Sequence, residues 1–497
     1  MKNYLSVGLL VLLATGSLVL GQETSYLPQV ADGQGQGQGL VIKTTFVFFN
    51  PSQEAVGVQL FLTDYAGGPL ALVIPDLGTG ANFTFSLGPG GTRFFQSAGA
   101  GPLQVGGARV EATRAIGVSA VFTILNGSGG FLTEAGLGAV VPMQRFILPV
   151  DATEGVDTGL ALLNVDQVET AISFRLHPES GASGPQAAFT LGASAQRAIF
   201  LSELFRQLGP FRGTLEVESS RPLAAVGVRQ NLATFTSTTL PVVPASSQQV
   251  AFQLPHIANG VYQGGSVRTT FLVFNLAARA AEVVVNLTRA GGSPFPVSIV
   301  GGAQNRSSFR INLAPGASAF LQTNGAGPLA SGGATITSDV PVGVASVFTF
   351  YDGQGAFQTE AGVGNASALS SFTIPVDTTA SFDTGVALFN PGTSDSRVTV
   401  RLLDKEGTRI GLQELTLPGK GQQALLVKSA FQGASLQGSL SITASASVSA
   451  LTLRVNASPL SYTTLPRVAQ SFAGVVPGPA LPGNTITDVG EIWLGPR

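Results

Sequence analysis

The chain has 497 residues, of which 44% are apolar and only 11% are charged, and its formal net charge at neutral pH is −2. So small and balanced a charge gives no electrostatic basis for binding nucleic acid or an anionic membrane surface. The chain contains no cysteine, which excludes disulfides, thiolate metal sites and a thiol nucleophile. Its length allows several domains, each with enough apolar residues for a core of its own.

The N-terminus has the pattern of a secretory signal peptide over residues 1–21. Lys2 supplies the positive start, residues 5–20 are mostly apolar, and small residues precede a cut at Gln22. A membrane anchor is the alternative, and it is disfavoured because small and polar residues interrupt the apolar run. We therefore expect an exported protein, extracellular, at the cell surface or periplasmic, with no membrane span after cleavage. A cysteine-free exported protein is more typical of a bacterium than of an animal.

One short motif recurs along the chain: a Thr, a small polar or Gly residue, four apolar residues and an Asn. The copies are Thr44–Asn50, Thr158–Asn164, Thr269–Asn275 and Thr384–Asn390. Four apolar residues that end at a turn-forming Asn are typical of a strand buried on both faces. The near-constant spacing of the copies predicts four domains that are built alike.

Longer matches relate the first domain to the third and the second to the fourth. Thr133–Gly138 recurs as Thr359–Gly364, and Phe146–Asp151 corresponds to Phe372–Asp377. The chain is therefore interpreted as a tandem duplication of a two-domain unit. Alternating apolar and polar residues predict short strands elsewhere, as in a β-sandwich, and residues 202–208 are expected to form one or two helical turns.

The predicted fold is all-β, with four tandem immunoglobulin-like sandwiches arranged as two copies of the two-domain unit. The predicted segments are the signal peptide 1–21, sandwich 1 at 22–142, sandwich 2 at 143–247, sandwich 3 at 248–368, sandwich 4 at 369–468, and a C-terminal linker with an added strand at 469–497. The linkers between domains are short, which predicts an extended rod.

The chain resembles uncharacterised exported bacterial proteins built of tandem immunoglobulin-like sandwiches. The resemblance is carried by the Leu-Pro and Ala-Asp-Gly opening at residues 27–33, by the strand at residues 44–51, and by Thr-Glu-Ala-Gly at residues 133–136. It covers nearly all of residues 24–468. It implies the fold and, by analogy alone, a role in surface adhesion or as a spacer.

The sequence lacks the motifs of the common enzyme classes, and we predict no enzymatic activity and no cofactor. The only histidines are His177 and His256, which fall in different domains, and neither a Gly-x-Ser-x-Gly elbow nor a phosphate-binding glycine motif is present. His256 stands where the first domain has Gln29. Two histidines without cysteine do not make a standard zinc site.

Glu134 and Glu360 occupy matching positions in otherwise apolar, small-residue stretches. They are candidates for a ligand contact or a general acid. The alternative is a carboxylate that caps backbone N–H groups in a glycine-rich turn. We favour that alternative, because a single carboxylate per domain has no partner for paired acid–base work.

Several acidic residues cluster near the predicted junctions between domains, where calcium could bind through carboxylate and carbonyl oxygens. The calcium candidates are Asp151, Glu154, Asp157, Asp377 and Asp383. Turn-stabilising aspartates are the favoured interpretation, because Glu154 is replaced by Ala380 in the other copy. Arg229 and Arg454 also match, and are expected to be solvated or salt-bridged strand residues.

The C-terminal segment contains Trp493, the only Trp of the chain and a candidate interaction residue. Residues 485–494 are rich in β-branched residues and are predicted to dock as an added strand on a sheet edge. A frayed tail is the alternative.

Taken together, these features predict an exported, non-enzymatic structural or adhesive protein, an extended rod of β-sandwich modules. Its partner is an unidentified protein or a surface glycan, and its sheet edges offer a route to self-association. The alternative is a carbohydrate-binding or carbohydrate-active extracellular protein. That alternative is weakened by the scarcity of Trp and Tyr for stacking sugars.

Overall fold

The computed structural model describes residues 23–35, 39–153, 155–465 and 467–469. The predicted signal peptide, Glu154, Trp493 and the predicted added strand lie outside the described residues. The described part is almost entirely β-strand, which confirms the predicted all-β class. None of its helices is long and apolar enough to cross a bilayer.

The strands form four sheets of eight strands, each taken from a continuous part of the chain, and we call these parts modules 1 to 4. Module 1 contains β1 (Glu23–Gln34), β2 (Val41–Phe49), β3 (Val56–Asp64), β6 (Asn82–Leu87), β7 (Thr92–Gln96), β8 (Gln104–Ala112), β9 (Gly117–Leu125) and β10 (Phe131–Gly138), with a small hairpin of β4 (Leu72–Ile74) and β5 (Gly78–Gly80). Module 2 contains β11 (Met143–Ala152), β12 (Val156–Asn164), β13 (Thr170–Pro178), β14 (Gln186–Leu191), β15 (Gln196–Phe200), α1 (Leu201–Leu204), β16 (Phe211–Asn231), β17 (Ser237–Leu240) and β18 (Val243–Pro244). The short helix α1 overlaps the start of the predicted helical segment 202–208 and begins one residue before it.

The other two modules repeat this organisation of strands. Module 3 contains β19 (Ala251–Tyr262), β20 (Gly265–Asn275), β21 (Ala281–Arg289), β22 (Ser308–Leu313), β23 (Ser318–Gln322), β24 (Ala330–Ser338), β25 (Val342–Asp352) and β26 (Phe357–Gly364). Module 4 contains β27 (Leu369–Asp377), β28 (Phe382–Phe389), β29 (Ser396–Asp404), β30 (Arg409–Leu417), β31 (Gln422–Leu426), α2 (Val427–Ala430), β32 (Gln437–Ala457), β33 (Leu460–Leu465) and β34 (Val468–Ala469).

Each module folds into two layers with its core between them. In module 1 the outer layer has the order β6-β3-β8-β1 and the inner layer has the order β7-β2-β9-β10, all antiparallel. Module 3 has the same orders. In modules 2 and 4 one long strand, β16 or β32, pairs in the outer layer through its first half and in the inner layer through its second half.

The recurring Thr-to-Asn motif forms the buried strand at the centre of each inner layer, as its apolar run predicts. Its Thr hydroxyl makes two hydrogen bonds with the backbone of the module's first strand. Thr44 Oγ1 donates to the Ala31 carbonyl at 2.7 Å and accepts from the Ala31 N–H. Its Asn closes the following turn. The Asn50 amide donates to the Glu54 carbonyl at 2.7 Å and the Gly88 carbonyl at 2.9 Å. The motif therefore satisfies backbone groups that its burial removes from water.

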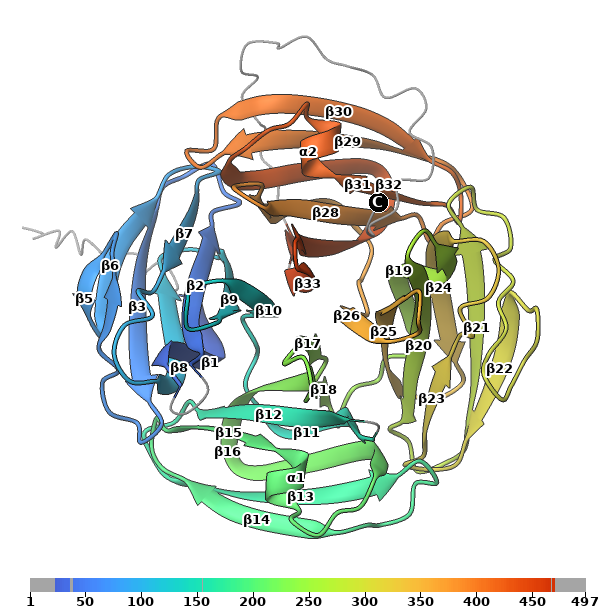
Figure 1. Ribbon diagram of the computed structural model, residues 1–497, viewed down its shortest axis with the longest axis horizontal. Helices are drawn as coiled ribbons and strands as arrows, with labels where there is room; N and C mark the ends of the chain where they lie inside the picture. Colours follow the sequence, from blue (N-terminus) through green and yellow to red (C-terminus); the bar gives the residue numbers. More distant parts are fainter. Residues whose placement is uncertain (1–22, 36–38, 154, 466, 470–497) are drawn as a thin grey trace, which may run out of the picture.

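The four modules are arranged in a ring, with module 4 in contact with module 1 (Figure 1). The predicted extended rod is therefore wrong. Short linkers restrict how far neighbouring domains can separate, but they do not determine the direction in which the chain turns at each junction. Here every junction turns the same way, so the last module meets the first.

Apolar contacts continue from one module into the next. The core of module 1 includes Ala161 and Val226 of module 2, and the core of module 3 includes Leu453 and Tyr462 of module 4. Tyr462 is fully buried and stacks on Phe350 at 5.0 Å between ring centroids. Buried apolar contacts of this kind resist separation of the modules.

The middle of the ring is formed by β10, β17, β26 and β33, one strand from each module (Figure 1). These strands come so close that a side chain on Gly136 or Gly362 would collide with a backbone carbonyl. A Cβ atom would lie 2.6 Å from the Thr464 oxygen at Gly136, and 2.3 Å from the Thr239 oxygen at Gly362. The glycine of the recurring Thr-Glu-Ala-Gly sequence is thus required for this close approach.

The ring predicts that the two halves of the chain stay together after the link between them is cut. A protease site inserted at the exposed Ser246, between modules 2 and 3, should give two fragments on a denaturing gel. In gel filtration the cut protein should elute with the uncut ring, because two junctions hold the halves together. Elution as separate halves would contradict the ring.

Candidate functional site

The polar residues singled out by the sequence meet at two junctions of the ring. At the junction of modules 2 and 3, the Arg229 guanidinium from β16 contacts Glu360 of β26 and lies 3.5 Å from Asp151 of β11. We call these three residues the 2–3 cluster. At the junction of modules 4 and 1, a second cluster has the same composition and is called the 4–1 cluster. It contains Arg454 of β32, Glu134 of β10 and Asp377 of β27, with Arg454 Nη2 at 3.1 Å from Asp377 Oδ2.

The strands position these side chains in the same way in both clusters. The Arg is placed in the second half of the long strand, opposite the Thr of the recurring motif: Arg229 pairs with Thr158, and Arg454 with Thr384. The Glu comes from the strand of the next module that reaches the middle of the ring. The burial of both glutamates follows, since Glu134 is 1% exposed and Glu360 is 0% exposed.

This geometry corrects the favoured interpretation of Glu134 and Glu360 as caps of backbone N–H groups. Each carboxylate contacts a guanidinium of another module, so both residues connect modules. The partner of each glutamate is distant in the sequence: Arg454 and Glu134 are 320 positions apart, and Arg229 and Glu360 are 131 positions apart. Of the two expectations for the arginines, a solvated or a salt-bridged position, the structure shows salt bridging.

Burial dominates the electrostatics of the two glutamates. Desolvation raises the pKa of Glu134 to about 7, although the Arg454 charge acts in the opposite direction and Asp377 adds to the rise. Burial likewise raises the pKa of Glu360, against the effect of Arg229. The Oε1 atom of each glutamate is buried and has no hydrogen-bond partner among the described residues. Such an oxygen is poorly stabilised as an anion, which is consistent with the raised pKa values.

The calcium candidates are engaged by protein groups. Asp151 Oδ1 accepts from the Thr153 hydroxyl at 2.5 Å, and Asp377 Oδ1 accepts from the Thr379 hydroxyl at 2.6 Å. Asp157 accepts from the Ser202 hydroxyl at 2.5 Å.

Asp383 accepts the backbone N–H of Thr384 at 2.7 Å and that of Lys428 at 3.1 Å, while burial raises its pKa. Within the described ranges, no group of three His, Cys, Asp or Glu side chains is placed to hold a metal ion. These four aspartates stabilise turns and junctions.

The two histidines lie apart and serve different contacts. His256 is buried at the junction of modules 3 and 4, where its Nδ1 lies 3.2 Å from the Gln422 amide nitrogen. Burial lowers the pKa of His256 to about 4, so the imidazole is neutral at pH 7. At the junction of modules 1 and 2, Gln29 takes the equivalent place and accepts from Gln196 at 2.5 Å. His177 lies 3.2 Å from Glu216.

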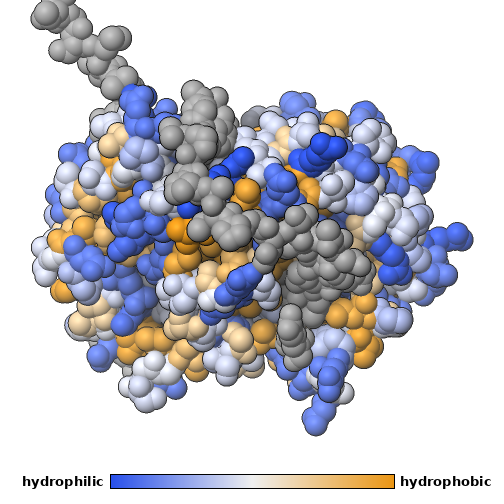
Figure 2. All heavy atoms as spheres, turned by 90° about the horizontal axis from the view of Figure 1, so that it is seen from above, coloured by the Kyte–Doolittle hydropathy of each residue, from blue (hydrophilic) through white to orange (hydrophobic). Residues whose placement is uncertain are grey.

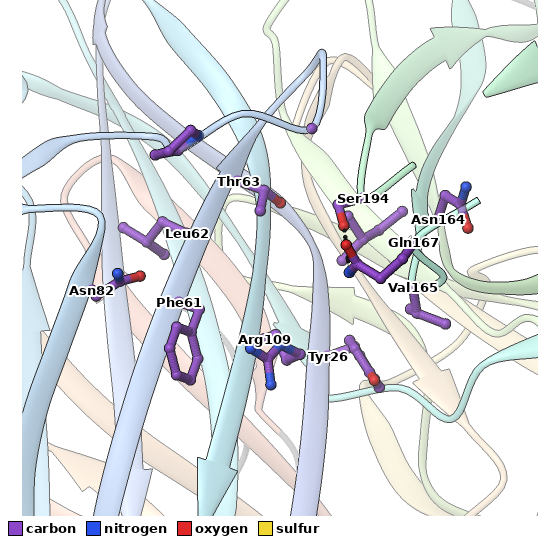
Figure 3. A pocket seen from close by; sticks show the side chains of 13 residues that line it. Tyr26, Phe61, Leu62, Thr63, Asn82, Arg109, Asn164, Val165, Gln167 and Ser194 are labelled. Atoms are coloured by element: carbon purple, nitrogen blue, oxygen red, sulfur yellow. Dashed lines mark hydrogen bonds between the residues drawn. The ribbon is translucent and has the colours of Figure 1, made fainter. Parts of the chain in front are cut away.

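A shallow pocket of about 280 Å³ opens at the junction of modules 1 and 2 (Figure 3). Module 1 contributes Tyr26, Phe61 and Arg109, and module 2 contributes Asn164 and Gln167. The Arg109 guanidinium lies over the Phe61 ring at 4.2 Å from its centroid. One aromatic face of the pocket is therefore already covered by a cation.

No protein-family model matches the chain, and no curated protein sequence does. Solved structures show only slight similarity. Dimeric latent PorU from Porphyromonas gingivalis is 9% identical, with a TM-score of 0.13, over 71% of this chain and 32% of that one. A β-glucuronidase of Bacteroides uniformis is 11% identical, with a TM-score of 0.12, over 52% of this chain and 27% of that one. An α-L-rhamnosidase of Streptomyces avermitilis is 9% identical, with a TM-score of 0.10, over 87% and 57%. Similarity at this level supports no conclusion about the function.

The 4–1 cluster predicts energetic coupling between residues at opposite ends of the chain. Arg454→Met leaves Glu134 and Asp377 buried without their guanidinium and should cost about 3–5 kcal/mol of unfolding free energy. Adding Glu134→Gln removes one of the two carboxylate charges left without a guanidinium. The loss of unfolding free energy in the double variant should therefore be smaller than the sum of the two single losses by more than about 1 kcal/mol. Urea unfolding of the four proteins of the cycle measures this coupling.

Glu360 provides a matched control for that cycle, because it has the same environment at the opposite junction. Arg454→Met combined with Glu360→Gln should be additive within about 0.5 kcal/mol. Equal coupling to both glutamates, or none to Glu134, would contradict the assigned contact.

The raised pKa of Glu134 predicts a pH dependence of stability. The folded state holds the proton more tightly than the unfolded state, so this contribution is complete below the ordinary glutamate pKa. It is lost as pH rises through about 7. Between pH 5 and pH 8, the unaltered protein should lose up to roughly 3 kcal/mol of unfolding free energy through Glu134, and Glu134→Gln should abolish this part of the loss. Urea titrations at both pH values measure it. Glu218→Gln, on the exposed face of β16, should leave the pH dependence unchanged, and the idea fails if the two variants behave alike.

Proposed function

We propose that the protein is an exported, non-enzymatic structural or adhesive protein that acts as a rigid ring through the outer edges of its sheets. The proposal includes the signal peptide, a bacterial origin, the tandem duplication of immunoglobulin-like sandwiches, and a location at or outside the cell surface or in the periplasm. The partner is another protein, a surface glycan or a second copy of the chain.

The observation that carries the proposal is the distribution of free strand edges. In each module the two edges of the inner layer approach a neighbouring module or the middle of the ring. Among the described residues, the outer edges β6, β14, β22 and β30 are paired on one side only and lie around the perimeter (Figure 1). An antiparallel edge offers backbone N–H and carbonyl groups to an added strand.

The side chains of these edge strands suit contact with a partner in water. In β22, Ser308, Arg310 and Asn312 are exposed and alternate with buried apolar residues, and β14 exposes Gln186 and Thr190. On the side of the ring seen in Figure 2, hydrophilic residues are interspersed with hydrophobic ones. Such a surface favours recognition through backbone edges and polar groups over a single large apolar patch.

The environment of the carboxylates favours a non-enzymatic role. Glu134 and Glu360 are the carboxylates best matched to acid–base work by their raised pKa values, yet both are buried against arginines. Glycoside cleavage needs two carboxyl groups on either side of an accessible bond. The Asp residues beside these glutamates are held by the same arginines.

A carbohydrate-binding role is the alternative, and the pocket of Figure 3 is the observation in its favour. Tyr26 and Phe61 are partly exposed there, beside the amides of Asn82 and Gln167. A glycan array distinguishes the two classes. Tight binding of one glycan that is lost in Tyr26→Ala would replace the structural role by this one.

Edge pairing predicts self-association that depends on the outer strands. In sedimentation velocity, a protein of residues 23–469 should form oligomers, and their fraction should increase with protein concentration. Thr190→Lys with Asn312→Lys should reduce them, because each adds a charge to an outer edge. Gln59→Lys with Ser173→Lys adds the same charge to interior strands and should behave like the unaltered protein. A protein that stays monomeric throughout would exclude a second copy of the chain as the partner, and an equal effect of both pairs would contradict recognition through the outer edges.

A further inference from the structure

The junction of modules 2 and 3 contains a cavity that the 2–3 cluster does not fill. Its volume is about 460 Å³, and it extends from β11 and β16 of module 2 to β20, β23 and β25 of module 3. A cavity of this size is in the range that holds small ligands.

The cavity has an excess of positive charge. Among the described residues that line it, Arg212, Arg229 and Arg268 are opposed by Asp151 and Glu360. Arg229 is engaged by both carboxylates. Arg212 reaches Asp151 at 3.4 Å and Thr153 at 3.2 Å, and its buried Nε has no hydrogen-bond partner among the described residues.

Arg268 is the most available of the three cations. It makes no ion pair with any described residue, its buried Nε has no hydrogen-bond partner, and its guanidinium lies over the Tyr351 ring at 4.7 Å. A guanidinium presents a planar set of donors that matches a carboxylate. Arg212 is placed similarly over Phe320, at 5.3 Å from the ring centroid.

The rest of the lining is neutral and polar, with some apolar surface. Asn231, Thr270, Gln322 and Thr349 offer amide and hydroxyl groups, which suit the hydroxyls of a ligand. Phe320 and other apolar side chains complete the wall. The combination fits an acidic sugar better than a simple inorganic anion.

The matching junction of modules 4 and 1 lacks these features. Gln437 stands in the place of Arg212, because it pairs with Asp377 as Arg212 pairs with Asp151. Phe382 stands in the place of Val156, and its ring lies 3.4 Å from the guanidinium carbon of Arg454. The 4–1 cluster is thus covered by an aromatic ring at the point where the 2–3 cluster faces open space.

Lys43 replaces Arg268 at the 4–1 junction. Each precedes the buried Thr of the motif and lies against a corresponding glycine, Gly99 or Gly325. The 4–1 set of Lys43, Arg454, Glu134 and Asp377 is therefore balanced in charge, whereas the 2–3 set carries one positive charge more.

We propose that the cavity between modules 2 and 3 binds a uronate, a monosaccharide carboxylate, with the carboxylate held by Arg212 and Arg268 and the hydroxyls held by the neutral polar lining. The site is separate from the outer strand edges. Its failure would leave the edge proposal intact, and loss of edge pairing would leave this site intact.

Calorimetric titration with D-galacturonate tests the site, with D-galactose as its neutral counterpart and inorganic phosphate as a plain anion. Galacturonate should bind, galactose should not, and binding should weaken as salt is raised. No binding of galacturonate would overturn the proposal. Phosphate binding as tight as that of galacturonate would overturn the assignment to an acidic sugar.

Two substitutions locate the site with little risk to folding, because each introduces the residue that the matching junction already contains. Arg212→Gln copies Gln437, and Val156→Phe copies Phe382. Each should weaken galacturonate binding by about tenfold or more, the first by removing a charge-assisted contact and the second by filling the cavity. Gln437→Ala, at the other junction, should leave binding unchanged. Unaltered binding in Val156→Phe, with a folded protein by circular dichroism, would place the ligand elsewhere.

Discussion

The arrangement of this protein depends on two guanidinium groups, one buried and one half-buried, each of which contacts carboxylates from two modules. Glu134 and Glu360 are almost completely removed from water, and a buried carboxylate is costly unless a cation and hydrogen-bond donors reach it. Arg454 and Arg229 can do so only if module 4 meets module 1 and module 2 meets module 3. The pairs therefore favour one geometry over the many that short linkers allow. Apolar contacts across the junctions supply cohesion, and the charged pairs supply specificity.

Closure of the ring determines which surfaces remain for interaction. The strands nearest the centre come together so closely that Gly136 and Gly362 admit no side chain. The inner-layer strands β7, β23 and β31 come close to the neighbouring modules. What remains is a set of outer edges on the perimeter, one from each module, presented at fixed angles by a framework that does not need disulfides. In the proposed role, several similar edges on one ring would strengthen weak binding through multivalency.

The two charged junctions share the same Arg–Glu–Asp cluster but differ in the residues that surround it. One is covered by Phe382 and balanced in charge, whereas the other keeps a smaller Val156 and gains the Arg212 guanidinium. A structural role alone accounts for the part that they share. It does not account for the open volume at one of them or for Arg268, which makes no ion pair with any described residue there. This difference is the basis for assigning a ligand to that junction.

The sequence by itself determined the class of fold, the repeated strands and the matching of modules 1 with 3 and 2 with 4. These features depend on local periodicity, such as the apolar run between Thr44 and Asn50, and on turn-forming residues at its end. It also marked Glu134, Glu360, Arg229 and Arg454 as matched polar residues, and it gave salt bridging as one of two expectations for the arginines. Only the tertiary structure paired each Glu with its Arg, since that contact requires segments 320 and 131 residues apart to meet. The ring could not be predicted from the sequence either, because the angle between modules depends on packing at all the junctions together and has no local sequence pattern. For the same reason Arg212 and Arg268 gained significance only when the fold placed them around one cavity.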